Sequence, residues 1–327
     1  MRSGRCLVVM YHYVRDSGAT PFPGIRALPP AHFEQQLDWL QREYTVVGVE
    51  ALRAALDGGP PLPPDAALLT FDDGFRDHYE AALPLLARRG LSGVFFLSHD
   101  ACAPAPRLLG VHQTHFLIAR LGAAAFARDV LAECALAAPA ADAARGGRVF
   151  GADRWEAHDE RALKHLLNYE LPFAEADRVL DTLFRRHLGD PAAFAAGLYL
   201  DAAQVREMAR AGMVFGYHTR SHRMLSRLSQ AEQAQELRGG AAWIRELTGQ
   251  AHVPFCYPWG GTKTYTAETV RLLETSGYTL AFNTVRRRAD LAVDNRFEIP
   301  RYDTRDLPPY TTGEHDAAAA AVPVEEA

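Results

Sequence analysis

The segment Leu69-Thr70-Phe71-Asp72-Asp73-Gly74 joins an apolar run to a pair of carboxylates and a glycine. Two neighbouring anions repel one another and are costly to remove from water, so a buried strand that ends in them needs a reason. Ligands and catalytic groups collect at the carboxyl ends of strands in α/β folds. A cation beside the pair would keep the carboxylates ionised, so the sequence predicts a functional site at the end of this strand.

Short apolar runs of the same kind recur along the chain and alternate with segments of helical spacing. Apolar residues three or four positions apart, such as Phe33, Leu37 and Leu40, predict helices between the runs. The alternation predicts an α/β fold with a parallel sheet or barrel. The expected buried strands are residues 6–10, 67–71, 93–97, 214–217, 253–257 and 279–282.

Residues 103–198 break this rhythm, because they are rich in Ala, Leu and Arg and contain no convincing strand. We expect an all-helical insertion or cap there, between a first barrel part at 1–102 and a second at 199–312. A tail at 313–327 is expected to be disordered. The helical patterns lie at 115–121, 126–136, 160–167 and 177–188, and the expected loops at 137–141 and 145–147.

Several side chains of the insertion could carry chemistry, but they are scattered along its sequence. We interpret them as surface and core residues, not as a second metal site. They are His112, His115, His158, His165 and Trp155.

Composition narrows the class of protein. The 327 residues are 48% apolar and carry a formal net charge of −5, with both signs interspersed, so no basic stripe indicates nucleic acid. The cysteines, at positions 6, 102, 134 and 256, form no CxxC pair and are interpreted as reduced thiols. The apolar run at 6–10 is too short for a signal peptide or a membrane span, so we expect a cytoplasmic protein.

A second cluster of candidate residues is the segment Gly216-Tyr217-His218-Thr219-Arg220-Ser221-His222, which also follows an apolar run. Histidines four positions apart can converge on one metal, either on a helical turn or on a loop. One aspartate and two histidines make a three-ligand site with open positions, as in catalytic zinc centres. The other aspartate can then accept a proton from water. An isolated Asp-Asp-Gly is most often a turn and an isolated His pair is most often solvated, but both follow strands here.

These motifs resemble those of the polysaccharide deacetylases, the NodB-like carbohydrate esterases of family 4. The sequences TFDDG and HTRSH are similar to the first two motifs of the family, and FCYPWG at 255–260 is similar to the third. The opening MYHYV and the later FEQQLDWLQREYTVV resemble a subgroup with an N-terminal Tyr-His strand. The resemblance covers the chain to about residue 100 and from about 200 to 305. It implies a distorted (β/α)7-type barrel and metal-dependent N-deacetylation of amino sugars.

The resemblance also implies roles for individual residues. Asp72 would be the general base, and Asp73, His218 and His222 would bind a divalent metal, Zn²⁺ or else Co²⁺, Mn²⁺ or Ni²⁺.

The third motif would form the substrate pocket. Pro258 and Trp259 would line the acetyl group, and a backbone N–H near Trp259 would stabilise the oxyanion. Tyr257 and Trp259 offer flat faces to a sugar ring, or are ordinary barrel aromatics.

One departure from the family concerns the charge that holds the base. Cys256 stands where the family has an arginine, and a cysteine cannot form that ion pair. Arg301, in Ile299-Pro300-Arg301-Tyr302, follows another short apolar segment. We predict that Arg301 tethers Asp72; the alternative is a surface arginine.

A second departure concerns the catalytic acid. The late Leu-x-x-His motif of the family is missing after Thr279, and His315 lies in a polar tail. His12 ends the first strand and is our candidate acid, as in subgroup members with a permuted barrel order. The alternative is a core histidine satisfied by backbone.

The predicted function is hydrolysis of the acetamide of an N-acetylated amino sugar, in a glycan or linked to a lipid or nucleotide, to a free amine and acetate. Two alternatives stay open: a hydrolase of a formamide or purine-derived amide, and a catalytically decayed glycan-binding module. The expected partner is a carbohydrate and not a nucleic acid, with peripheral membrane contact if the substrate is lipid-linked. A helical cap over the mouth would favour a small or lipid-linked sugar over a long polymer.

Overall fold

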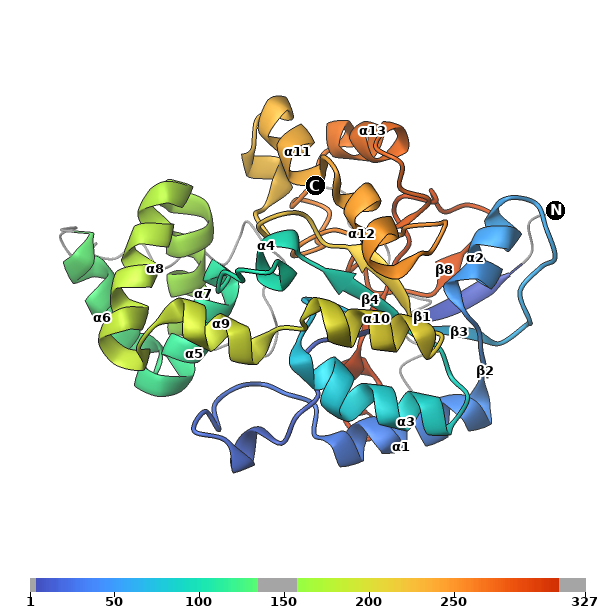
Figure 1. Ribbon diagram of the computed structural model, residues 1–327, viewed down its shortest axis with the longest axis horizontal. Coiled ribbons are helices and arrows are strands. Elements are labelled where there is room, and N and C mark those ends of the chain that lie inside the picture. The colour runs from blue at the N-terminus through green and yellow to red at the C-terminus, as the bar shows by residue number, and fades with distance from the viewer. Residues whose placement is uncertain (1–3, 135–157, 312–327) are drawn as a thin grey trace.

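The computed structural model describes residues 4–134 and 158–311. The loops predicted at 137–141 and 145–147, Trp155 and the tail predicted at 313–327 lie outside these residues. The described residues form a mixed α/β fold around a curled, mostly parallel sheet (Figure 1).

The central strands lie side by side in parallel and match the six runs predicted from the sequence. In spatial order they are β1 (Arg5–Tyr11), β3 (Ala66–Phe71), β4 (Val94–Leu97), β5 (Val214–Tyr217), β6 (Phe255–Cys256) and β7 (Ala281–Phe282).

One late segment closes the curled sheet. Ile299 bridges Phe282 of β7, and β9 (Tyr302–Asp303) pairs in parallel with β1. Residues 299–303 therefore span the gap between the first and last strands, which confirms the distorted barrel implied by the family resemblance. The short strands β2 (Thr45–Val46) and β8 (Ala289–Asp290) pair with the beginnings of β3 and β1.

The two faces of the barrel strands belong to different apolar clusters. Alternate residues such as Val8, Leu68 and Phe96 fill the interior, and the buried face of helix α2 (Val49–Leu56) belongs to the same cluster. The residues between them, such as Phe71, face the outer helices. Because both faces are buried, each strand reads as a continuous apolar run.

Helices surround the barrel, and several begin at side-chain caps, including Asp201, Ser229 and Thr266. The α-helices of this layer, besides α2, are α1 (Pro30–Glu43), α3 (Leu83–Arg88), α4 (His99–Cys102), α10 (Ala202–Arg210), α11 (Gln230–Leu237), α12 (Gly240–Thr248) and α13 (Ala267–Thr275). A π-helical turn, η2 (His78–Ala82), precedes α3, and short 3-10 turns are η1 (Ser17–Ala19), η4 (Leu225–Arg227) and η5 (Thr304–Asp306).

The described part of 103–198 is helical and projects from one side of the barrel (Figure 1). Its elements are α5 (Gly110–Leu121), α6 (Ala123–Glu133), α7 (His158–His165), the π-helical turn η3 (Leu166–Glu170), α8 (Phe173–Leu188) and α9 (Pro191–Leu198). Its apolar residues join the cluster outside the barrel strands, so insertion and barrel share a continuous core. No helix among the described residues combines the length and apolar character that crossing a bilayer requires.

Candidate active site

The turn after β3 sends the two aspartates into different surroundings. Asp73 has a φ of +74° and Gly74 a φ of +64°, so the chain reverses directly after Asp72. A Cβ at Gly74 would lie 2.8 Å from the sulfur of Cys102 and 2.9 Å from Leu97 Cδ2. Only glycine fits this turn, which explains the residue that follows the aspartate pair.

Backbone strain is concentrated at this mouth of the barrel. Among the described residues, the non-glycine positions with positive φ are Asp73, Thr219, His222 and Trp259. Such conformations cost on the order of 1–3 kcal/mol each and cluster at functional sites. The predicted metal loop is therefore held in a strained form, and not as a helical turn.

Asp73, His218 and His222 converge as the motifs predicted. Asp73 Oδ1 lies 3.5 Å from His218 Nε2 and 3.3 Å from His222 Nε2, and the candidate ligand atoms all lie within 4.8 Å of one another. Oδ1 is buried and has no hydrogen-bond partner among the described residues. His218 Nδ1 lies 2.8 Å from the carbonyl of Cys256, to which it can donate, leaving Nε2 as a free ligand. This donor set fits a divalent metal such as zinc.

The protonation states also suit a metal. Burial raises the pKa of Asp73, but His112 and His222 outweigh it and hold that pKa well below its usual value. Burial, with His222 nearby, lowers the pKa of His218 to about 4. At neutral pH the carboxylate is charged and His218 is neutral, as metal ligands must be.

Asp72 is paired with Arg301 instead. Arg301 Nη1 donates to Asp72 Oδ1 over 2.8 Å, and Nη2 donates to Oδ2 over 2.7 Å. The arginine is 1% exposed, so it is not a surface residue, and its Nε donates to the Asn283 carbonyl. Burial raises the pKa of Asp72, but attraction to Arg301 outweighs burial and lowers it to about 2.

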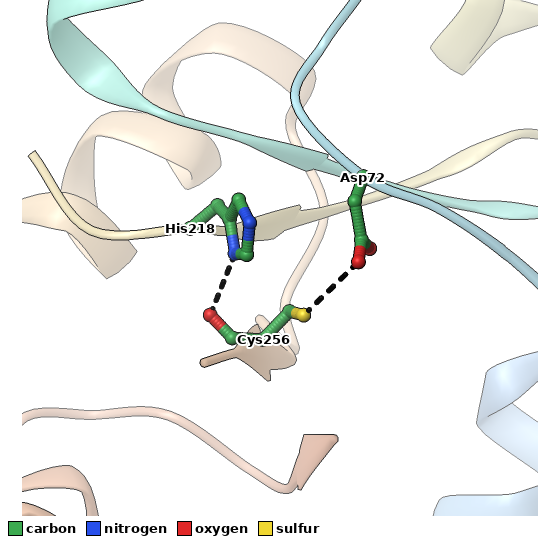
Figure 2. A group of neighbouring side chains, drawn as sticks. All are labelled: Asp72, His218 and Cys256. Carbon is green, nitrogen blue, oxygen red and sulfur yellow. Dashed lines mark hydrogen bonds between the residues drawn. The ribbon is translucent and has the colours of Figure 1, made fainter. Parts of the chain in front are cut away.

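Cys256 lies between these two centres. Its sulfur is 3.0 Å from Arg301 Nη2. The sulfur also points at Asp72, 3.6 Å from Oδ2 (Figure 2). By distance alone, Asp72, His218 and Cys256 form a second group that could hold a metal. Two observations disfavour it: Arg301 already occupies the Asp72 carboxylate, and burial raises the pKa of the thiol well above its usual value.

His12 stands at the edge of the same mouth. Its Nε2 lies 3.8 Å from Asp72 Oδ2, and its side chain is 40% exposed, so it is not a core histidine. His78 Nε2 lies 2.8 Å from the backbone carbonyl of His12 and can donate to it, which holds this end of β1 in place.

Of the third motif at residues 255–260, Trp259 lies beside the proposed metal ligands, whereas Tyr257 does not. The Trp259 ring lies 5.7 Å from the His222 ring, and both residues line a small cavity of about 80 Å³. Pro258 is buried beside Trp259. The prediction that Tyr257 offers a face to a sugar is wrong: it is 1% exposed, stacks on Tyr265, and its hydroxyl donates to the Phe297 carbonyl.

The insertion supplies a residue that sequence reasoning missed. His112 of α5 is fully buried, and its Nε2 lies 3.2 Å from Asp73 Oδ2. Nothing in the insertion sequence marks this histidine, because the position depends on how α5 packs against the barrel. His115, on the same helix, lines the larger cavity at the mouth.

This larger cavity has a volume of about 250 Å³ and lies between barrel and insertion. His12 and Asp73 line it from the barrel, and His115, Glu160 and Lys164 line it from the insertion. The insertion therefore forms part of the wall of the cavity that reaches His12 and Asp73.

Comparison with known proteins points to the same family as the motifs. The family profile described as polysaccharide deacetylase matches residues 167–281, a range that includes His218 and His222 but not Asp72 and Asp73. Over these residues the chain is similar to the polysaccharide deacetylases. The resemblance found in the motifs is thus confirmed, while the subgroup with an N-terminal Tyr-His strand stays a prediction.

Individual relatives agree with this family. The chain is 34% identical over 82 residues to a poly-β-1,6-N-acetyl-D-glucosamine N-deacetylase of Escherichia coli K12, an alignment that spans 24% of this chain and 12% of that relative. The fold is similar to the Streptococcus pyogenes deacetylase PplD in complex with acetate, at a TM-score of 0.57 and 17% identity over 98% of this chain and all of that one. It is also similar to IcaB from Ammonifex degensii, at 0.55 and 20% identity over 97% and 96% of the two chains.

Proposed function

We propose that the protein is a metal-dependent carbohydrate N-deacetylase that hydrolyses the acetamide of an N-acetylated amino sugar to an amine and acetate. The observation that carries the proposal is the buried Asp73 Oδ1, which faces His218 and His222 and has no hydrogen-bond partner among the described residues. Beside it stands Asp72, an ionised carboxylate that is not needed as a ligand.

Asp73, His218 and His222 would hold the metal, which we propose to be Zn²⁺, with Co²⁺, Mn²⁺ or Ni²⁺ as substitutes. When bound, the metal polarises the amide carbonyl and makes water more acidic. Asp72 is the general base. Its pKa of about 2 keeps it ionised at neutral pH but makes it a weak base, so it depends on water that has become more acidic.

Arg301 holds the base in place. Its two donors occupy both oxygens of Asp72 and keep the carboxylate in one orientation. His12 is the proposed acid. It lies at the cavity wall within 3.8 Å of Asp72, where it can donate a proton to the leaving nitrogen.

The remaining group is the oxyanion of the addition intermediate. A backbone N–H near Trp259 is the proposed donor, because this residue stands beside His222. Addition of water to the carbonyl carbon and cleavage of the C–N bond then give acetate and the free amine.

The proposed substrate carries N-acetylglucosamine or a similar sugar, as the name of the Escherichia coli relative suggests. The cavity of about 250 Å³ falls below the roughly 300–1,000 Å³ of pockets that enclose drug-sized ligands. This size supports one sugar residue at a chain end, or one linked to a lipid or nucleotide. A lipid-linked substrate would bring the protein into peripheral contact with a membrane.

Organisation and location are also proposed. Residues 1–102 and 199–312 would form the deacetylase barrel and 103–198 a cap beside its mouth. The cysteines at 6, 102, 134 and 256 are free thiols, which supports a reducing compartment such as the cytoplasm.

Acetate release is the direct test. We expect release from at least one of β-1,6-linked N-acetylglucosamine oligomers, nucleotide-linked N-acetylglucosamine and lipid-linked N-acetylglucosamine. A chelator should abolish release, and Zn²⁺ or Co²⁺ should restore it. Formate release from N-formyl sugars alone would support the formamide alternative. Sugar binding without any hydrolysis would support a glycan-binding module.

A further inference from the structure

We propose that His112 is a positioning residue for the metal centre: its Nε2–H donates to Asp73 Oδ2 and so directs Asp73 Oδ1 at the metal. The inference rests on the proposed function, because it assumes that Asp73 is a metal ligand. It assigns a role to helix α5 of the insertion, which lies outside the three motifs and outside the residues 167–281 that the family profile matches.

The two oxygens of Asp73 have different neighbours. Oδ1 faces His218 and His222, at 3.5 Å and 3.3 Å from their Nε2 atoms. Oδ2 lies 3.2 Å from Nε2 of His112. This residue is fully buried, and its Nε2 makes no other contact of hydrogen-bond length and no hydrogen bond of regular geometry among the described residues. A donor on Oδ2 would fix the rotation of the carboxylate and leave Oδ1 for the metal.

His112 is not a further ligand. The ligand atoms of Asp73, His218 and His222 lie within 4.8 Å of one another, and His112 is not part of that group among the described residues. Its ring is 6.2 Å from the ring of His222. His112 therefore acts on the metal through Asp73.

Tyr199 selects the form of His112 that can donate. The backbone N–H of Leu109 donates to the Tyr199 hydroxyl over 3.2 Å, and that hydroxyl lies 2.5 Å from His112 Nδ1. A tyrosine hydroxyl has one proton, and with Leu109 as its donor it can give that proton to Nδ1. The ring proton of neutral His112 then sits on Nε2, which faces Asp73. The opposite tautomer would place a nitrogen lone pair against the carboxylate.

The ring of His112 is also fixed by packing. Phe75 lies 4.8 Å from it, ring centre to ring centre, and Tyr199 lies 5.5 Å from it. Leu109 and His112 come from the start of the insertion, and Tyr199 follows its last helix. The path Leu109–Tyr199–His112–Asp73 therefore joins the docking of α5 to the metal centre.

The test is the zinc dissociation constant of the full chain, stripped of metal and titrated against a chromogenic chelator. H112F keeps a ring but loses the donor, and we expect about 10- to 100-fold weaker zinc binding. H112Q can place an amide N–H near the original Nε2, whereas H112N reaches only as far as Nδ1. We expect H112Q to bind zinc close to the wild-type affinity and H112N to bind as weakly as H112F.

H187N is the matched control, because His187 also contacts an aspartate, Asp129 at 2.9 Å, but within the insertion and away from the site. Its zinc affinity should equal that of the wild type. Thermal unfolding without metal shows which variants fold. If H112F does not fold, the difference between H112Q and H112N decides the question.

The outcomes separate the two proposals. If the wild-type protein binds zinc no better than D73N, the proposed metal site fails. If the wild type binds zinc and loses it in D73N, but H112F or H112N binds as tightly as the wild type, the role of His112 alone is overturned. Equal weakening in H112Q and H112N would also overturn it, because a purely structural role does not depend on the reach of the amide.

Discussion

Asp73 is contacted from two regions of the molecule, the barrel and the helical insertion. The loop after β5 brings His218 and His222 to Oδ1, whereas α5 brings His112 to Oδ2. On the barrel side the residues follow parallel strands that end at one edge, so chain order already places them together. On the insertion side the contact exists only because the helix docks at one angle. The barrel strands therefore supply the proposed metal ligands, and the helical insertion supplies the residue that contacts one of them.

The largest effects should come from the two aspartates of the barrel. Substitution of Asp73 and of Asp72 should differ in whether the protein still binds zinc. D73N should lose both bound zinc and activity, because it removes a ligand. D72N should lose about 10²- to 10⁴-fold in kcat, because it removes the general base, yet keep zinc. Metal content and kcat of the two purified variants check this. Loss of zinc in D72N, with zinc retained in D73N, would mean that Asp72 and not Asp73 is the metal ligand.

The next largest effect should come from the ion pair between Arg301 and Asp72, and it should appear in the free energy of unfolding. R301M leaves Asp72 buried without its partner, so we expect the free energy of unfolding to fall by about 3–5 kcal/mol. The control is R88M, which removes an ion pair to Glu34 from an arginine that is 60% exposed, and should cost at most about 1 kcal/mol. Urea unfolding measures both. Similar losses of stability in the two variants would show that the buried Arg301–Asp72 pair stabilises the fold no more than an exposed ion pair does.

His78, which contacts the His12 carbonyl after β1, should make the fold sensitive to acid. Burial lowers the pKa of His78 to about 4 from the ordinary histidine value of 6.5, so between these values the unfolded chain binds more protons than the folded one. Stability should therefore fall as pH drops from about 6.5 to 4, by about 3 kcal/mol for this group. H78Q should flatten this decline when unfolding is measured along the pH series. An unchanged slope would place the acid sensitivity elsewhere.

The smallest effects should come from the third motif. W259A should raise KM a few-fold with little change in kcat, because an aromatic face contributes about 0.5–1.5 kcal/mol to packing with a ligand. Y257F should leave both constants unchanged, because the Tyr257 hydroxyl bonds to Phe297 inside the core. Steady-state kinetics on the best substrate compare the pair. A higher KM in Y257F would show that the Tyr257 hydroxyl contributes to substrate binding.

Much of the barrel half could be predicted from the sequence. The alternation of apolar runs and helical patterns predicted the parallel α/β fold and its six central strands, and the ends of those strands pointed to Asp72, Asp73, His218 and His222. Arg301 followed from the family resemblance: Cys256 stands where the family has the arginine that holds the base, so another arginine after a short apolar segment was the candidate.

What escaped prediction has physical reasons. Strands β2, β8 and β9 are two residues long, too short for any periodicity. Tyr257 was misjudged although side chains alternate along a strand: Cys256 faces the interior and Asp72, so its neighbour points outward. His112 had no local signal at all, because its partner depends on helix docking.

The most direct test of the account is a crystal structure of the zinc-loaded protein with the metal located by anomalous scattering. The account predicts one zinc bound by Asp73 Oδ1 and by Nε2 of His218 and His222, at zinc–nitrogen distances of about 2.0–2.1 Å. Asp72 should still be paired with Arg301. A zinc bound instead by Asp72 and the sulfur of Cys256, with Arg301 displaced, would contradict it.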